Sequence, residues 1–263
     1  MKNTMSLLTE KDFSDIKDEI ANGRLSPDSI RFYILAFMIF SGIAVGVAYM
    51  AANSWNTVIG WENLSTFWQI IFKLQVVLFL YQLVLIFLVR GKSNWTQILL
   101  IISYVFYTYK MALDPFVAMS MFAMDRGEYE TFAPILLIII IVGFVFHLYL
   151  VIREFTSLKD KKVKKKIRKK KKQGSLLLYA FFPILLMFVA ITGYIVKNEL
   201  LGDNGILFGV GIFTFLYIAV MIGAVEFVMA AYCVVRFPSF RVNPAPRKIP
   251  PQRKKVRTKR NRR

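Results

Sequence analysis

Six runs of about 20 largely apolar residues constrain the fold of this sequence more than any other feature. In an α-helix a run of this length covers about 30 Å, the thickness of the hydrocarbon layer of a membrane. We therefore predict an all-α, multi-pass integral membrane protein with six transmembrane helices. The predicted spans are residues 30–52, 67–89, a third span that begins near Trp95, and residues 133–152, 175–196 and 206–235.

The basic residues predict the orientation of these spans. Of 35 Lys and Arg residues, 31 lie on one predicted side of the membrane, counting Arg31 at the start of the first span with the N-terminal segment. Only Arg126 and Lys197 lie on the other side, whereas Lys73 and Lys110 lie within spans. Because cytoplasmic loops are enriched in Lys and Arg, both termini are predicted to be cytoplasmic, and the short loops favour a bacterial cytoplasmic membrane.

This topology divides the chain into five segments. The first has a possible capping box, Thr9 with Asp12, followed by apolar residues on one helical face. Such a helix would either lie on the membrane surface or dock on another part of the protein. The segments are a cytoplasmic amphipathic segment (1–25), spans 1–4 (26–152), a cytoplasmic polybasic loop (153–174), spans 5–6 (175–236) and a disordered, basic, proline-containing cytoplasmic tail (237–263).

The loop and the tail are the most distinctive features of the composition, which has a formal net charge of +19. Bases next to a membrane bind anionic lipid of the inner leaflet, and the same field would attract an acidic protein partner or, through phosphates, RNA or a ribosome. The basic run of the loop, residues 159–172, lacks aromatic residues for base stacking, which argues against RNA. The residues assigned to this contact are Lys161, Lys162, Lys164, Lys165, Lys166, Arg168, Lys169, Lys170, Lys171, Lys172, Arg253, Lys254 and Lys255.

Lys110 and Asp114 lie four residues apart in span 3, next to Pro115. The favoured interpretation ends the span near Leu113, with Asp114 capping a new helix that starts at Pro115 and Lys110 reaching the outer headgroups. In the alternative, an intramembrane ion pair beside a proline marks a transport site. Lys73 is expected to reach the outer interface as well, or else to face Asp114 or a polar outer vestibule.

Glu226 in span 6 lies about 15 Å from the inner boundary at helical rise, so it should be paired or protonated. His147 in span 4 lies in the same half of the membrane, as does Gln82 in span 2. A contact between Glu226 and His147 would form a proton- or substrate-linked site. The competing interpretation is a polar clamp between helices.

No phosphate-binding loop or hydrolase motif is present. With one cysteine, Cys233, and one histidine, a metal site is not expected, nor is a cofactor. We therefore expect a non-enzymatic subunit or scaffold of a larger membrane assembly, of the secretion or export type, that recruits anionic lipid or protein partners and could form oligomers. The alternatives are a small transporter, permease or immunity-type protein that uses Glu226 and His147, and a lipid-acting membrane enzyme.

Overall fold

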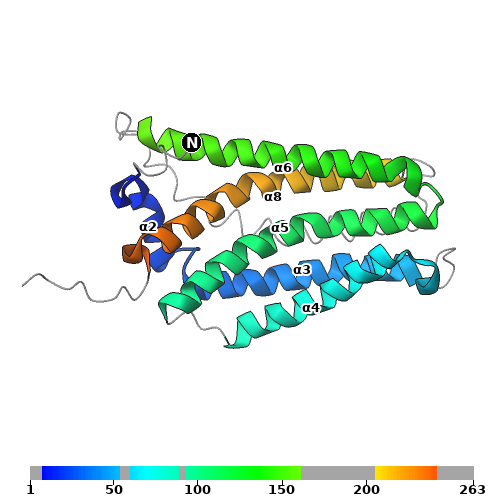
Figure 1. Cartoon of the computed structure of the whole chain (residues 1–263), viewed down its shortest axis with the longest axis horizontal. Helices are drawn as coiled ribbons and strands as arrows, with labels where there is room; N and C mark the ends of the chain where they lie inside the picture. Colours follow the sequence, from blue (N-terminus) through cyan, green and yellow to red (C-terminus); the bar gives the residue numbers. More distant parts are fainter. Residues whose placement is uncertain (1–7, 54–59, 89–92, 161–204, 242–263) are drawn as a thin grey trace, which may run out of the picture.

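A computed structural model describes residues 8–53, 60–88, 93–160 and 205–241, and all regular structure in these ranges is helical (Figure 1). Within these ranges five helices are long and apolar enough to cross a membrane, and the protein is therefore membrane-embedded. These are α3 (Pro27–Asn53), α4 (Thr66–Leu88), α5 (Asn94–Asp125), α6 (Tyr129–Asp160) and α8 (Gly205–Arg236). Shorter helices are η1 (Glu10–Phe13), α2 (Ser14–Asn22), η2 (Trp61–Asn63) and η6 (Pro238–Phe240).

Five of the six predicted spans thus coincide with helices. The predicted fifth span, residues 175–196, and the polybasic loop residues 161–174 lie outside the described residues. α3 begins at Pro27, before the predicted span, as expected for proline at a first helical position. α6 continues past the predicted end of span 4, residue 152, and ends at Asp160.

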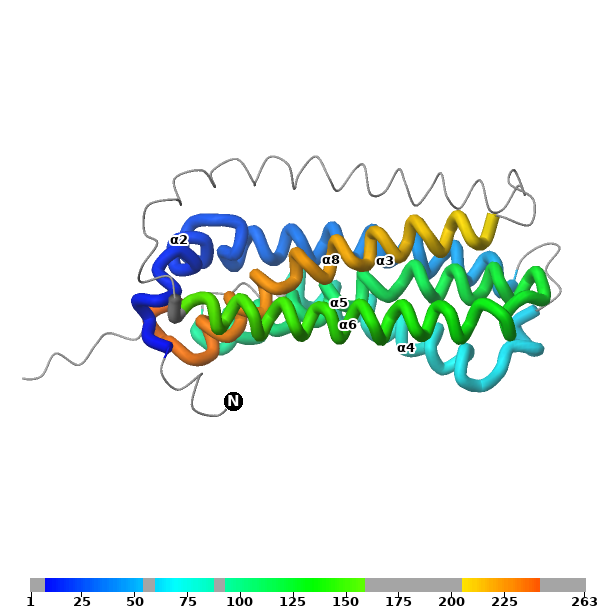
Figure 2. Tube along the Cα trace, turned by 90° about the horizontal axis from the view of Figure 1, so that it is seen from above, coloured from blue at the N-terminus to red at the C-terminus, as the bar shows by residue number. Residues whose placement is uncertain are grey.

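The five long helices lie side by side in a bundle with α5 at its centre, between α3 and α8 (Figure 1). α5 is the most buried of the five, whereas α6 exposes most of its apolar surface. α2 and η6 lie at one end of the bundle, here called the α2 end, as both views show (Figures 1 and 2). α3 and α5 begin at this end, and α4, α6 and α8 finish there.

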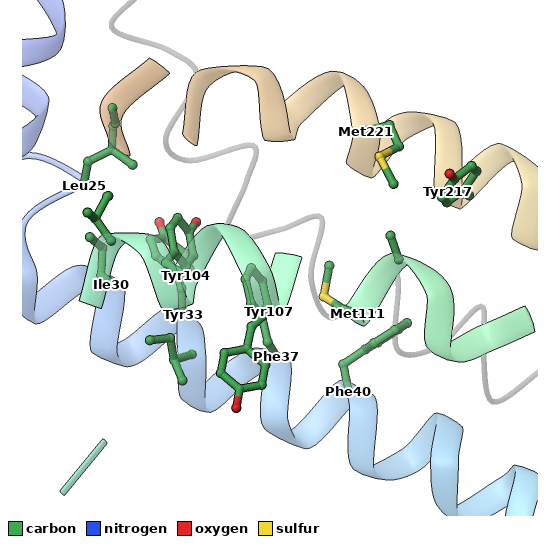
Figure 3. Close-up of a cluster of buried hydrophobic side chains, with 14 of the residues drawn as sticks. Leu25, Ile30, Tyr33, Phe37, Phe40, Tyr104, Tyr107, Met111, Tyr217 and Met221 are labelled. Atoms are coloured by element: carbon green, nitrogen blue, oxygen red, sulfur yellow. The ribbon is translucent and has the colours of Figure 1, made fainter. Parts of the chain in front are cut away.

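Aromatic and aliphatic side chains fill the seam between α3 and α5 (Figure 3). Phe37 stacks on Tyr104 with ring centroids 5.5 Å apart, and Tyr33 packs against the same ring at 5.9 Å. In lipid, helices are held together by van der Waals packing and polar contacts rather than by the hydrophobic effect. These close ring contacts therefore explain why α5 packs so extensively against α3.

The N-terminal segment docks on the bundle at the α2 end. The backbone N–H of Thr9 donates to the Asp12 carboxylate at 2.8 Å, which starts η1. Phe13 is buried, and its ring centroid lies 6.3 Å from that of Phe155 in α6 and 5.8 Å from that of Tyr232 in α8. Of the two placements left open by the sequence, docking on the protein is the one found.

The predicted disordered tail begins with folded residues. Phe237 lies against the Phe13 ring at 5.9 Å, and η6 buries Phe240. The prediction of disorder from residue 237 is therefore wrong for residues 237–241, because two aromatic rings find partners at the end of the bundle. Residues 242–263 lie outside the described residues.

Candidate functional site

Lys110 and Asp114 form an ion pair in the middle of α5. The Lys110 Nζ lies 2.8 Å from Asp114 Oδ2, and the two side chains are only 6% and 2% exposed. Four residues separate them, so they occupy successive turns of one helix face. A charged pair buried to this degree is stable only if its remaining hydrogen-bonding capacity is satisfied.

Two neighbouring helices supply those partners. From α3, the Ser41 hydroxyl donates to Asp114 Oδ2 and accepts from Lys110 Nζ. From α4, Gln75 Nε2 donates to Asp114 Oδ1 at 3.0 Å, and the Phe79 ring centroid lies 5.0 Å from the ammonium. The ion pair is therefore the centre of a polar contact that joins α3, α4 and α5.

The prediction that span 3 breaks at Asp114 is wrong. α5 is one continuous helix from Asn94 to Asp125 with Pro115 inside it. Pro115 lacks an N–H and cannot bond to the Met111 carbonyl. Helix packing on both sides of α5 keeps the chain helical there. Asp114 uses its carboxylate to hold Lys110, not as a cap, and Lys110 does not reach the headgroups.

Lys73 behaves differently from Lys110. It is exposed on α4, as a side chain that reaches an interface would be. Gln75, two residues further on, points inward and contacts Asp114 instead. Ser41 is thus a site residue that the sequence analysis did not single out. Its signal was weak: a polar residue inside an apolar run, with no indication of its partner.

His147 forms a second polar contact, on the other side of α5. Its Nδ1 lies 2.7 Å from the Met221 carbonyl oxygen in α8, and its Nε2 lies 2.7 Å from the Tyr109 hydroxyl. The imidazole is 1% exposed. Because a carbonyl only accepts, Nδ1 carries a hydrogen, and in the neutral ring Nε2 accepts from the tyrosine. His147 thereby joins α5, α6 and α8.

Glu226 does not meet His147. Its carboxylate pairs with the Arg24 guanidinium, which follows α2, and its side chain remains 36% exposed. Arg24 also lies 3.8 Å from Glu19. The Glu226–His147 site is therefore not formed, because the partner of Glu226 comes from the docked N-terminal segment, 202 residues away in the sequence. This arrangement is a clamp that ties the segment to α8.

The two polar contacts lie at similar positions along the bundle, each close to the middle of the helices that it joins. The residues concerned are Ser41 in α3, Gln75 in α4, Tyr109, Lys110 and Asp114 in α5, His147 in α6 and Met221 in α8. We call this set the polar belt. Its contacts join all five described long helices near the middle of the bundle.

Three buried polar atoms on α4 lack a hydrogen-bond partner among the described residues. They are Oε1 of Gln75 and both Oε1 and Nε2 of Gln82, and Gln82 is fully buried. Buried amides are nearly always paired with protein or ordered water. The belt therefore has unused hydrogen-bonding capacity on its α4 side.

The described residues contain no group of three or more His, Cys, Asp or Glu side chains that could hold a metal ion. What the belt can do chemically is hold helices together and, through Asp114 and Lys110, accept or release a proton. The basic residues 161–172 and 253–255, assigned to anionic partners, lie outside the described residues. Their attachment points, the end of α6 and the end of η6, both lie at the α2 end (Figures 1 and 2).

Comparison of the chain with protein-family models, with curated proteins and with solved structures finds no match.

Proposed function

We propose that the protein is a non-enzymatic membrane subunit or scaffold of a larger membrane assembly, of the secretion or export type. The α2 end is its cytoplasmic face in this proposal, and its basic loop and tail recruit anionic lipid or acidic partners. The observation that carries the proposal is that both basic segments start beside one folded platform, the cluster of aromatic rings around Phe13 at the α2 end. Phe13 contacts Phe155, near the start of the loop, and Phe237, at the start of the tail.

This geometry concentrates charge in one place. Residues 161–172 and the tail leave the bundle from neighbouring attachment points, so their bases act on the same patch of membrane or the same partner. Each base near anionic lipid contributes about 1 kcal/mol, with diminishing returns as the lipid charge is neutralised. A platform that keeps both attachment points together supports simultaneous binding, in which the second contact benefits from a high effective concentration.

The described helices also support the predicted topology. α6 and α8 both finish at the α2 end, so the end of α6 and the start of α8 lie at opposite ends of the bundle. An additional crossing between them, the predicted fifth span, would join these two points. With it the chain has six spans, and both termini lie on the side that carries most of the Lys and Arg.

The test is a functional comparison in the native host between the wild type and a chain whose loop and tail bases, residues 161–172 and 253–255, are replaced by Gln. A matched control keeps every charge but shuffles the order of residues 161–172. Abundance and orientation in the membrane are measured for each. We expect the neutralised chain to lose function and the shuffled chain to keep it. Full function of a correctly oriented neutralised chain would overturn the proposal.

A small transporter is the second candidate, and one observation favours it: the buried Lys110–Asp114 pair at the bundle centre. Intramembrane ion pairs are often parts of substrate or proton pathways. The residues that would carry transport are then Lys110 and Asp114 rather than Glu226 and His147. Loss of function in Asp114→Asn at normal abundance, with the neutralised chain active, would favour transport over the scaffold.

A further inference from the structure

A line of polar groups runs along one face of α4, from the polar belt toward the α2 end. It consists of Gln75, the Leu78 carbonyl, Gln82 and the Ile86 carbonyl, at intervals of three or four residues. Residues at this spacing share a helix face. We call this line the α4 polar stripe.

Side chains from α3 and α5 reach the stripe at two points. The Tyr107 hydroxyl donates to the Leu78 carbonyl at 2.8 Å, and Arg31 donates through Nε to the Ile86 carbonyl at 3.1 Å. Arg31 lies in the second turn of α3, at the α2 end, and Gln75 touches Asp114. The stripe therefore connects the charged pair at the bundle centre with a charged residue at one end of the bundle.

The unpartnered atoms lie on this stripe. Both atoms of the Gln82 amide lack a partner among the described residues, so rotating the amide to exchange its oxygen and nitrogen would leave both still unpaired. The stripe already presents donors and acceptors about one helix turn, 5.4 Å, apart. Two hydrogen bonds of about 2.8 Å through one water molecule span nearly the same distance.

The other side of the charged pair is apolar. Beyond it, toward the end opposite α2, the buried residues of α3, α4 and α5 form a hydrophobic cluster. Its members include Val45, Ala48, Trp68, Phe72, Ala118 and Met121. Apart from the Trp68 indole N–H, the side chains named here offer water no hydrogen-bond partner, so the cluster closes this side.

We propose that the α4 polar stripe binds a file of water molecules that links the Lys110–Asp114 pair to the α2 end. The ligands of this site are water and the protons that water carries, and access is from one side only. The proposal goes beyond the scaffold function and does not depend on it. It assigns Gln82 the role of a water-binding residue midway along the path.

The test uses two tyrosines of the unmodified full chain. Tyr107 and Tyr217 are both fully buried, and each hydroxyl donates to a backbone carbonyl, at 2.8 Å and 2.9 Å. Only Tyr107 lies on the stripe. Hydroxyl radicals generated from water by X-ray radiolysis oxidise side chains next to bound water, and mass spectrometry measures the rate at each tyrosine. We expect Tyr107 to be oxidised several-fold faster than Tyr217.

A variant then locates the water. Gln82→Leu removes the amide while keeping the side-chain size similar, and we expect it to lower the oxidation rate of Tyr107 toward that of Tyr217. Equal, slow oxidation of both tyrosines in the wild type would overturn the proposal without any variant. Fast oxidation of Tyr107 that Gln82→Leu leaves unchanged would also overturn it, since the water would then not be held by Gln82.

Discussion

Tyr109 and Lys110 are consecutive residues of α5, yet they bond to opposite halves of the bundle. The Tyr109 hydroxyl lies 2.7 Å from His147 in α6, whereas Lys110 reaches Ser41 in α3 and Asp114 in its own helix. Successive residues of a helix point about 100° apart, so one turn of the central helix can hold neighbours on both sides. The polar belt follows from this placement.

The Lys110–Asp114 pair should show strong energetic coupling. Lys110→Met leaves a buried carboxylate without its counter-ion, and Asp114→Asn leaves a buried ammonium, so each should cost about 3–5 kcal/mol of unfolding free energy. The double variant contains neither charge and should be more stable than the sum of the two losses predicts. Reversible unfolding in mixed detergent measures the three variants.

A control for this comparison of single and double variants is Lys73→Met, at the exposed lysine of α4. It should change the free energy of unfolding little. Strictly additive losses in the double variant would show that the two charges do not stabilise each other.

The imidazole of His147 should carry its hydrogen on Nδ1, because the Met221 carbonyl can only accept. His147 is the only histidine of the chain, so its ring nitrogens can be assigned by nitrogen-15 NMR without ambiguity. We expect the Nδ1–H tautomer in the wild type. Tyr109→Phe removes one partner and should cost about 0.6 kcal/mol, the average for such contacts between membrane helices.

Observation of the Nε2–H tautomer in the wild type would contradict this bonding pattern. Phe106→Leu, at a side chain that is 48% exposed on the same helix, is the control, and it should leave the signal of His147 unchanged.

The membrane-spanning helices could be predicted because each is encoded locally. An apolar run of sufficient length is helical in lipid whatever its neighbours are, since only a helix satisfies its backbone there. Docking of the N-terminal segment was one of two open placements because an amphipathic pattern shows that a face is buried but not against what. The ring contacts of Phe13 decide between the two.

The failed predictions all concern contacts between distant parts of the chain. Asp114 followed by Pro115 has the local pattern of a helix start, but Ser41 and Gln75 hold the carboxylate inside the bundle. The predicted contact between Glu226 and His147 rested only on their similar predicted depth in the membrane. The bundle instead places Arg24 beside it, and nothing in a single sequence ranks these two partners.

Phe13 should control docking of the N-terminal segment more than the Glu226 ion pair does. Phe13→Ala removes a buried ring and should cost about 3–5 kcal/mol, whereas a partly exposed ion pair contributes at most about 1 kcal/mol. Trypsin cleavage after Lys11 and Lys17 in detergent reports release of the segment. We expect a large increase in cleavage for Phe13→Ala and a small one for Glu226→Gln.

Phe32→Ala is the matched control for this comparison, because this ring is 57% exposed on α3 and its loss should leave cleavage unchanged. Rapid cleavage of Glu226→Gln with slow cleavage of Phe13→Ala would reverse the assignment and make the ion pair the main attachment.

Gly143 should be essential for the close approach of α6 and α8. A Cβ atom at this position would overlap the Tyr217 ring, and one turn further along the same two helices His147 bonds to Met221. Gly143→Ala should therefore cost about 1–3 kcal/mol by overpacking, and the separation of the helices should weaken the His147 bond. Thermal unfolding in detergent and the nitrogen-15 signal of His147 measure the two effects.

Gly211→Ala is the control, because no atom of the described residues lies within 4 Å of the Cβ that it would add. There alanine should stabilise the helix by up to about 1 kcal/mol, because it restricts the unfolded backbone more than glycine does. Equal thermal midpoints for the two variants would show that α6 moves away from Tyr217 at no cost. A destabilised Gly143→Ala with an unchanged His147 signal would confine the strain to the ring contact, and the polar belt would then not depend on the spacing of these helices.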